Sequence, residues 1–218
     1  MRVNIAEELV QETALRCLEY SENAPTEVNQ LRAWVFRIAS NLGIDYLRLR
    51  GTFNESIMID ARKLAESNDD FMASTASLRG SPEMAFVARE HLSACFNCTL
   101  GQLSPEKAAS LLLREIFGFS TQEIAVILQA SFAQVKNWLQ ESRVEMDMRY
   151  AKSCALINKN GVCYQCVELD DFYQVNKGNP LEKTQSTLDD RMQIMRDLTT
   201  QPDGKWTQLL SNLLNDLT

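Results

Sequence analysis

Apolar residues recur every three to four positions along most of the chain, which is the spacing of amphipathic helices. The stripe of the first predicted helix consists of Ile5, Leu9, Thr13, Leu15 and Leu18. Asn23 to Pro25 interrupts the pattern, and Pro25 suits the start of a second helix because proline is favoured in a first turn. The stripe of that helix consists of Leu31, Val35, Ile38, Leu42 and Tyr46, and Gly51 is expected to end it.

Two serine-proline-glutamate triplets predict the next helices, because each combines a hydroxyl cap, a proline in the first turn and an acid. The triplet at 81–83 starts a helix over 82–101, and the triplet at 104–106 starts one that runs to Phe117. Gly118 is expected to end the second of these helices.

Residues 120–143 carry the most specific local pattern. Ser120 and Glu123 match a capping box and predict a short helix that ends near Leu128. A tight turn at 129–131 leads to a final amphipathic helix over 131–150. The inward positions of the pair are Ile124, Ala125, Ile127, Leu128, Val135 and Leu139. This spacing predicts a helix-turn-helix, whose second helix enters the DNA major groove, while a plain helical hairpin is the alternative.

The remaining segments are less regular. Residues 53–81 are polar, acidic and weakly periodic, which predicts a linker with one short helix at most. Residues 151–180 look irregular, and the amphipathic helical pattern returns over 181–217. The predicted fold is all-α, with two small helical domains and a helical C-terminal extension. The predicted segments are 1–52, the linker 53–81, 82–150 and the cysteine-containing extension 151–218.

Composition narrows the classes of function. The chain has 218 residues with only eight glycines and five prolines, too few turn-formers for a β-rich fold. A net charge of −7 excludes nucleic-acid binding by bulk charge. Residues 28–50 nevertheless hold four arginines against one acid, a local basic face. A single histidine, with neither a nucleophile constellation nor a phosphate loop, predicts that the chain is not an enzyme.

Neither a long apolar run nor a signal peptide is visible, so we expect a cytoplasmic protein without a membrane partner. Structural disulfides are rare in that compartment. The six cysteines are therefore expected to bind metal or to undergo redox chemistry.

Two blocks of the chain resemble the extracytoplasmic-function (ECF) sigma factors. LSPEKAASLLLREIFGFSTQEIAVILQASFAQVKNWLQESR (103–143) is similar to their region 4. ELVQETALRCLEY (8–20) and LRAWVFRIASNLGIDYLRLR (31–50) are similar to their region 2. The resemblance implies an alternative sigma factor that binds core RNA polymerase and directs promoter-specific transcription initiation. It also implies promoter DNA and an anti-sigma factor as partners, and a region 2 truncated at its N-terminus by one helix.

The resemblance also carries over site residues in region 2. The polymerase-binding positions are Glu8, Leu9, Val10, Gln11 and Glu12. The positions on the helix that recognises the −10 element are Arg32, Trp34, Arg37, Asn41, Asp45, Arg48 and Arg50. Arginines along a helix can neutralise phosphates, and an aromatic ring beside them can stack on an unpaired base. A plain core position is the alternative for Trp34.

The recognition helix of region 4 departs from the family pattern, which usually shows several basic residues after the Val-Lys step. Here Glu141, Glu145 and Asp147 outweigh the cations, so weak binding of duplex DNA is expected. The candidate DNA contacts on this helix are Gln134, Lys136, Asn137, Gln140 and Arg143. The alternative is a helix that contacts protein, in a sigma-derived interaction module that has lost promoter reading.

Six residues could hold a metal. His91, Cys95 and Cys98 share one face of the helix over 82–101, beside its expected core stripe of Leu92, Phe96 and Leu103. A structural zinc needs four ligands, and the further donors are Cys154, Cys163 and Cys166. Zinc, or another thiophilic metal, suits such a donor set.

The spacing His-x3-Cys-x2-Cys resembles the motif of zinc-binding anti-sigma factors, and the cysteine-rich tail resembles that of metal-responsive sigma factors. Thiol–disulfide switching at Cys95 and Cys98, or at Cys163 and Cys166, is one alternative, and inert thiols are another. Cys17 is expected to be a small apolar filler. The helical tail over 181–217 is expected to pack on the sigma domains or to cover a binding face.

Overall fold

The computed structural model describes residues 2–50 and 99–153, together with single positions at 63, 67, 69, 73, 96, 188, 189, 192 and 196. Every regular element in these ranges is a helix, which confirms the predicted all-α fold. No helix among the described residues is both long enough and apolar enough to cross a lipid bilayer.

The chain forms two compact units that alternate along the sequence. The first unit joins residues 1–52 to residues 103–143, and the second joins 53–102 to 144–218. The first unit holds nearly all the described helices, and the sites predicted on those helices lie in it. The four segments expected from the sequence stay a prediction.

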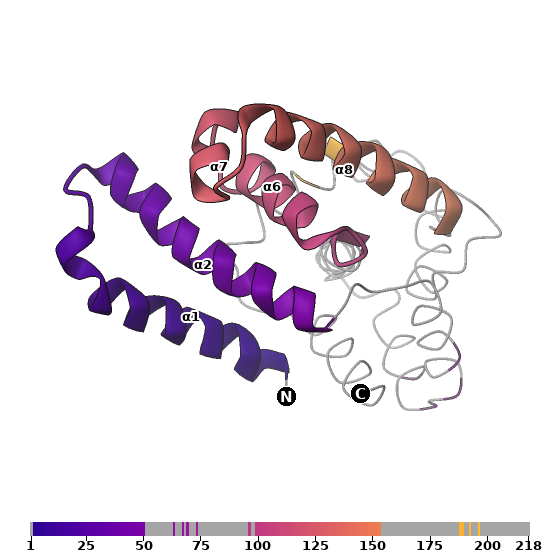
Figure 1. Ribbon diagram of the computed structural model, residues 1–218. Coiled ribbons are helices and arrows are strands. Elements are labelled where there is room, and N and C mark those ends of the chain that lie inside the picture. The colour runs from indigo at the N-terminus through magenta and orange to yellow at the C-terminus, as the bar shows by residue number, and fades with distance from the viewer. Residues whose placement is uncertain are drawn as a thin grey trace, which may run out of the picture. The chain divides into compact units, whose positions relative to one another are not determined.

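The N-terminal part of the first unit is a helical hairpin (Figure 1). It consists of α1 (Arg2–Glu19), a short 3₁₀ helix η1 (Ser21–Asn23) and α2 (Val28–Arg50). The break lies where the sequence predicted it, but α2 begins at Val28 and not at Pro25. Ala24 precedes this proline and has the extended ψ of 132° that such a residue is forced to adopt, so the helix starts only further on.

The apolar stripe predicted for α1 is partly wrong. The side chains of Leu15 and Leu18 are 61% and 72% exposed. The partly buried positions recur every four residues instead, at Ile5, Leu9, Thr13 and Cys17. Glu12, next to Thr13, is also partly buried. The narrow stripe shows that α1 buries one line of side chains and leaves the rest of its circumference open.

Helix α2 lies between α1 on one side and α6 and α7 on the other (Figure 1). Every position over 33–40 is partly buried, all the way round the helix. Burial on all faces is expected for a helix that is covered from opposite sides. Of the predicted stripe, Val35, Ile38 and Leu42 are partly buried, whereas Leu31 at the open end is 38% exposed.

Three helices follow in the second half: α6 (Pro105–Glu115), α7 (Thr121–Ile127) and α8 (Phe132–Ser153). Their borders lie close to the predicted ones. Ser104 occupies the N-cap position of α6 in an extended conformation, with Pro105 in the first turn, but its side chain makes no cap hydrogen bond, and α6 ends at Glu115, two residues before the predicted Phe117. Gly118 has a φ of +73°, the left-handed conformation that ends a helix at little cost for glycine.

The predicted capping box starts α7. The Ser120 backbone N–H donates to Glu123 Oε2 at 2.7 Å, and the Glu123 N–H donates to Ser120 Oγ at 3.3 Å. The hydrogen bonds from the Ser120 side chain and backbone lower the pKa of the Glu123 carboxyl, burial opposes them, and the charge of Arg32 adds to the lowering. The ionised carboxylate is therefore the form that stabilises the helix start.

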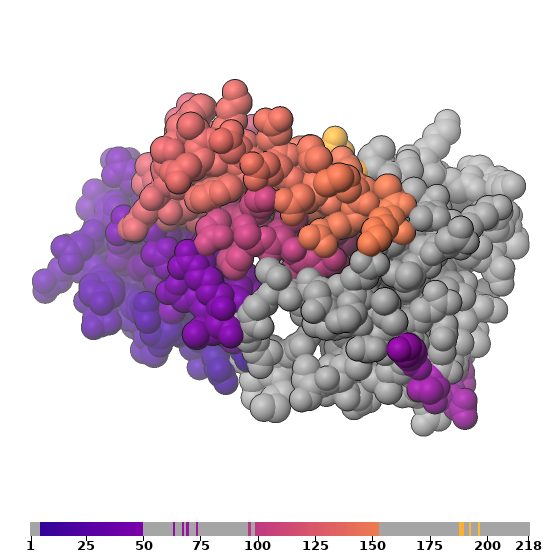
Figure 2. All heavy atoms as spheres, turned by 45° about the vertical axis from the view of Figure 1, so that its right-hand side comes forward, coloured from indigo at the N-terminus to yellow at the C-terminus, as the bar shows by residue number. Residues whose placement is uncertain are grey.

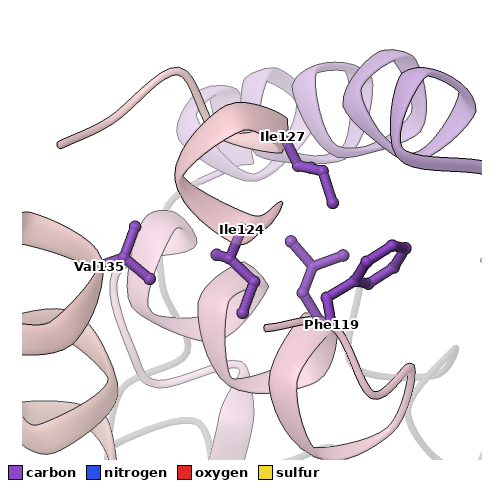
Figure 3. Close-up of a cluster of buried hydrophobic side chains, with 5 residues drawn as sticks. Phe119, Ile124, Ile127 and Val135 are labelled. Atoms are coloured by element: carbon purple, nitrogen blue, oxygen red, sulfur yellow. The ribbon is translucent and has the colours of Figure 1, made fainter. Parts of the chain in front are cut away.

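The core of this half is a cluster of five buried side chains: Leu113, Phe119, Ile124, Ile127 and Val135. They come from α6, from the link to α7, from α7 itself and from α8, and Figure 3 shows Ile124, Ile127 and Phe119 gathered beneath α7. Ala33 and Phe36 of α2 pack against the same cluster. One apolar centre therefore joins both halves of the first unit.

We expect Ile124→Ala to lower the free energy of unfolding by about 2–5 kcal/mol, because it leaves a cavity in this cluster. Val126→Ala on the same short helix is the matched control, since Val126 is 63% exposed and its truncation should cost about 0.5 kcal/mol or less. Urea denaturation followed by circular dichroism measures both, and equal losses would contradict the assigned core.

Glu123→Gln should lower the melting temperature at pH 7 and make no difference in acid. The pKa of Glu123 is lowered by folding, so its stabilising effect is complete above the unfolded pKa of about 4.3 and disappears as the pH falls through the folded pKa. Thermal melts of both proteins from pH 7 to pH 3 test this expectation. A difference that persists at pH 3 would show that the carboxylate charge is not its cause.

Candidate nucleic-acid interface

Helices α7 and α8 form the helix-turn-helix that the sequence predicted. The turn between them contains Gln129 with a φ of 52°, a left-handed residue that reverses the chain between the two helices. Ile124, Ile127 and Val135 are fully buried, and Ala125, Leu128 and Leu139 pack around them. The two helices are thus locked at a fixed angle through their shared core.

A second capping box, which the sequence analysis missed, starts α8. The Ser131 backbone N–H donates to Gln134 Oε1 at 2.9 Å, and the Gln134 N–H donates to Ser131 Oγ at 3.2 Å. The Ser-x-x-Gln spacing is the signal that could have revealed it. It occupies the amide oxygen of Gln134, so this candidate DNA contact can offer only its amide nitrogen, as a donor.

The polar candidates on α8 share one exposed surface. Gln134, Lys136, Asn137 and Gln140 are exposed, whereas Arg143 is partly buried. Figure 2 shows side chains of α8 at the surface of the molecule in that view. The opposite face of the same stretch carries Val135 and the fully buried Ser142. Helix α8 therefore presents amides and one lysine outward from a rigid apolar base.

Two charged side chains of α8 are paired with α6. The Arg143 guanidinium forms an ion pair with Glu115 of α6, and Lys107 of α6 pairs with Glu141 at 2.9 Å. These pairs fasten α8 to α6. The Arg143 pair also reduces the positive charge that α8 can offer to DNA. Over 132–142, the exposed first half of α8, Lys136 is the one cation.

Arg32, at one end of α2, is bound by the link between α6 and α7. Its Nη2 donates to the backbone carbonyl of Phe117. Its guanidinium carbon lies 4.1 Å from the centre of the Phe119 ring, a cation–π distance. The guanidinium still borders solvent, but its donors and its flat face are directed at α6 and α7.

Arg48, near the other end of α2, pairs with Glu106 in the first turn of α6. Its Nη2 lies 2.7 Å from Glu106 Oε1, and its Nη1 lies 3.3 Å from Asp45 Oδ1. Burial raises the pKa of Glu106, but the hydrogen bond and the charge of Arg48, together with a backbone hydrogen bond, lower it overall. The hydrogen bond with Glu106 in turn raises the pKa of Arg48.

The other candidates on α2 are distributed round the helix. Trp34 and Arg37 are partly buried, whereas Asn41 and Asp45 are exposed. The side chain of Arg50 lies outside the described residues. The intermediate burial of Trp34 suits a core position and a ring with one open face equally well, so both readings of this residue stand.

The polymerase-binding candidates are five consecutive residues of α1, so they are distributed round the whole helix. Glu8, Val10 and Gln11 are exposed, and Leu9 and Glu12 are partly buried. Glu12 accepts a hydrogen bond from Arg16 at 2.8 Å, one turn further on. Val10 is 69% exposed, so α1 also carries an open apolar residue.

The candidate metal ligands His91, Cys95, Cys98, Cys154, Cys163 and Cys166 all lie outside the described residues. Of the core stripe expected beside them, Phe96 is fully buried and Leu103 is 2% exposed, while Leu92 is also outside. Cys17 is a free, partly buried thiol, as expected of an apolar filler. The residues that are described contain no group of three or more His, Cys, Asp or Glu able to hold a metal.

Two family models match the chain in the order that the sequence blocks predicted. Residues 2–52 match sigma-70 region 2, and residues 93–146 match sigma-70 region 4. The first match covers α1 and α2, and the second covers α6, α7 and most of α8. The helix-turn-helix with its two capping boxes is therefore the core of a region 4.

Curated sigma factors are similar to about two thirds of the chain. The ECF RNA polymerase sigma factor SigE of Mycolicibacterium smegmatis is 29% identical over 147 residues, 67% of this chain and 52% of its own length. The ECF RNA polymerase sigma factor SigG of Mycobacterium tuberculosis is 29% identical over 155 residues, 65% of this chain and 40% of its own length. The chain thus spans about half or less of these relatives. A probable RNA polymerase sigma factor of Haemophilus influenzae is 24% identical over 156 residues, 66% of this chain and 76% of its own length.

No solved structure matches the chain at the same level of significance. The two region matches and the named relatives agree with the helical architecture described above. The chain therefore matches sigma-70 regions 2 and 4 and is similar to ECF sigma factors over about two thirds of its length.

Proposed function

We propose that the chain is an alternative sigma factor, a non-enzymatic subunit that binds core RNA polymerase through α1 and directs promoter-specific transcription initiation. The observation that carries this proposal is the presence of region 2 and region 4, in that order, in one chain. A polymerase subunit works beside the chromosome, so the cytoplasmic location expected from the sequence is part of the proposal.

Helix α8 is proposed to read the −35 element. A helix in the major groove distinguishes bases through amides, which bind adenine well, and through cations on phosphates. The exposed row of Gln134, Asn137 and Gln140 supplies the amides, Gln134 through its nitrogen alone, and Lys136 supplies the charge. The rigid base beneath α8 supports this role, because base reading requires side chains held at fixed positions.

Helix α2 is proposed to bind the −10 element. Arg32, Arg37 and Arg48 supply the cations for the backbone of the opened strand, and Asn41 supplies an exposed amide. Trp34 can stack on an unpaired base if its open face points outward.

Metal or thiol sensing is proposed as the regulation. His91, Cys95 and Cys98, with thiols from Cys154, Cys163 and Cys166, provide six donors, enough for one closed zinc-type site with spare thiols. Helical backbone at Phe96, Thr99 and Leu100 supports a helix that could present the first three donors. Bound zinc or another thiophilic metal would order the segments that hold it. Reversible thiol oxidation of the same cysteines is the alternative sensor, and an anti-sigma factor is a further possible regulator.

A second candidate function is a sigma-derived interaction module that binds protein and no longer reads promoters. The ion pair of Arg143 with Glu115 favours it, because this pair withdraws a cation from a helix already rich in acids. Binding to core polymerase without specific transcripts would support this module and contradict the sigma factor.

Run-off transcription from a library of genomic fragments with the cognate core polymerase tests the first proposal. We expect specific transcripts, and we expect Asn137→Ala with Gln140→Ala to reduce them about ten-fold or more, because a well-placed amide–base pair contributes about 1–3 kcal/mol. Gln122→Ala is the matched control, since it removes an exposed amide from α7. Equal loss in the control would contradict the role of α8.

Metal analysis of anaerobically purified protein tests the sensor. We expect about one thiophilic metal per chain, and we expect the Cys95→Ser, Cys98→Ser variant to lose it, because two of the donors are removed. Cys17→Ser should retain the metal and serves as the control. Metal-free native protein with reduced thiols would contradict the metal site.

A further inference from the structure

The two arginines that best mark α2 as a DNA-binding helix are held by region 4. Arg32 donates to the Phe117 carbonyl and lies over the Phe119 ring, and Arg48 pairs with Glu106. The two residues are 16 positions apart, about 24 Å along a helix, so the contacts hold both ends of α2. These partners were not predicted from the sequence.

The surface between the two arginines is apolar and well fitted. Ala33 and Phe36 pack against the buried cluster of the helix-turn-helix. The Phe36 ring meets Phe117 and Phe119 edge to face, with ring centres 4.7 and 4.9 Å apart. Aromatic pairs in this geometry attract through their quadrupoles in addition to the area they bury. The contact therefore has an apolar centre and an exposed polar pair near each end.

We propose that this packing is a closed state in which region 4 occupies the DNA-binding arginines of α2. Glu106 takes the place of a phosphate at Arg48, and the Phe117 carbonyl and the Phe119 ring take the place of a phosphate and a base at Arg32. A DNA strand along α2 would have to displace these partners and would approach the negative charge of Glu106. The closed state and the binding of DNA by α2 therefore exclude each other.

The closure is selective. The exposed amides and lysine of α8 lie outside this contact. The closed state therefore blocks the DNA-binding arginines of α2 and leaves the exposed surface of α8 accessible. Both polar pairs border solvent, where an ion pair contributes little on its own. The closed state can therefore be opened by a modest change in free energy, such as polymerase binding supplies. This inference rests on the proposed function of α2.

The test compares full-length variants altered on the region 4 side, so that α2 keeps its arginines. Glu106→Gln removes the partner of Arg48, and Phe117→Ala removes the ring against Phe36 while retaining the backbone carbonyl. Glu22→Gln removes the same charge as Glu106→Gln from an exposed position in η1 and is the control. Hydrogen–deuterium exchange over 28–50 and 105–127 reports opening. Fluorescence anisotropy with a short mixed-sequence single-stranded DNA at low salt reports the availability of α2.

We expect faster exchange in both variants and tighter binding of the single strand, because the apparent affinity scales with the open fraction. The gain should be about two- to five-fold for Glu106→Gln and about two- to ten-fold for Phe117→Ala. Glu22→Gln should match the wild type in both measurements. Binding to a mixed-sequence duplex through α8 should stay unchanged in all the proteins.

Unchanged exchange in both variants would show that these contacts do not hold α2. Faster exchange with no gain over Glu22→Gln in strand binding would show that closure does not exclude DNA. Either result overturns the closed state. If it occurs while the wild type still gives specific transcripts with core polymerase, the proposed function stands. Tighter strand binding by the variants in a protein that gives no transcripts would support the closed state and overturn the sigma factor.

Discussion

The burial of Phe119 is the constraint on which the first unit depends. This side chain is 1% exposed, although it lies in the five-residue link between α6 and α7. Gly118 turns the backbone in its left-handed conformation, the Phe119 N–H donates to the Leu113 carbonyl, and the Phe119 carbonyl accepts from Arg114 at 3.1 Å. The ring then meets α7 on one side and α2 on the other. A change in this link would disturb both regions together.

The sequence predicted what depends on local chemistry. The capping box at Ser120, the end of α6 shortly before Gly118 and the helix-turn-helix spacing all follow from contacts within a few residues. The stripe at Leu15 and Leu18 was wrong, because periodicity shows which positions are apolar but not how wide a face the neighbouring helix covers. The capping box of Ser131 and Gln134 could have been predicted from its spacing. It was missed because Gln134 was interpreted only as a base contact.

The partners of the candidate DNA-binding residues could not be predicted. Arg48 contacts Glu106, 58 residues further along the chain, and Arg32 contacts Phe117, 85 residues further along. A single sequence, read without an alignment, carries no information on pairs so far apart. Arg143 was read as a DNA contact, yet Glu115 already binds it. A basic residue on a helix that resembles a DNA-binding helix is thus weak evidence for a DNA contact, because acidic groups of the protein compete for the same charge.

Gln134 has two roles at one position, one in capping α8 and one in the proposed contact with a base. Its oxygen completes the capping box of α8, and its nitrogen is free to face a base. Glutamate could keep the cap but would lose the donor, whereas most other residues would lose the cap. Evolution toward a different base preference at this position therefore has few open routes. A change there would be tolerated best after a stabilising substitution elsewhere in the helix pair. Under the proposed role of α8, the order in which mutations arise would then shape which promoters a lineage can come to use.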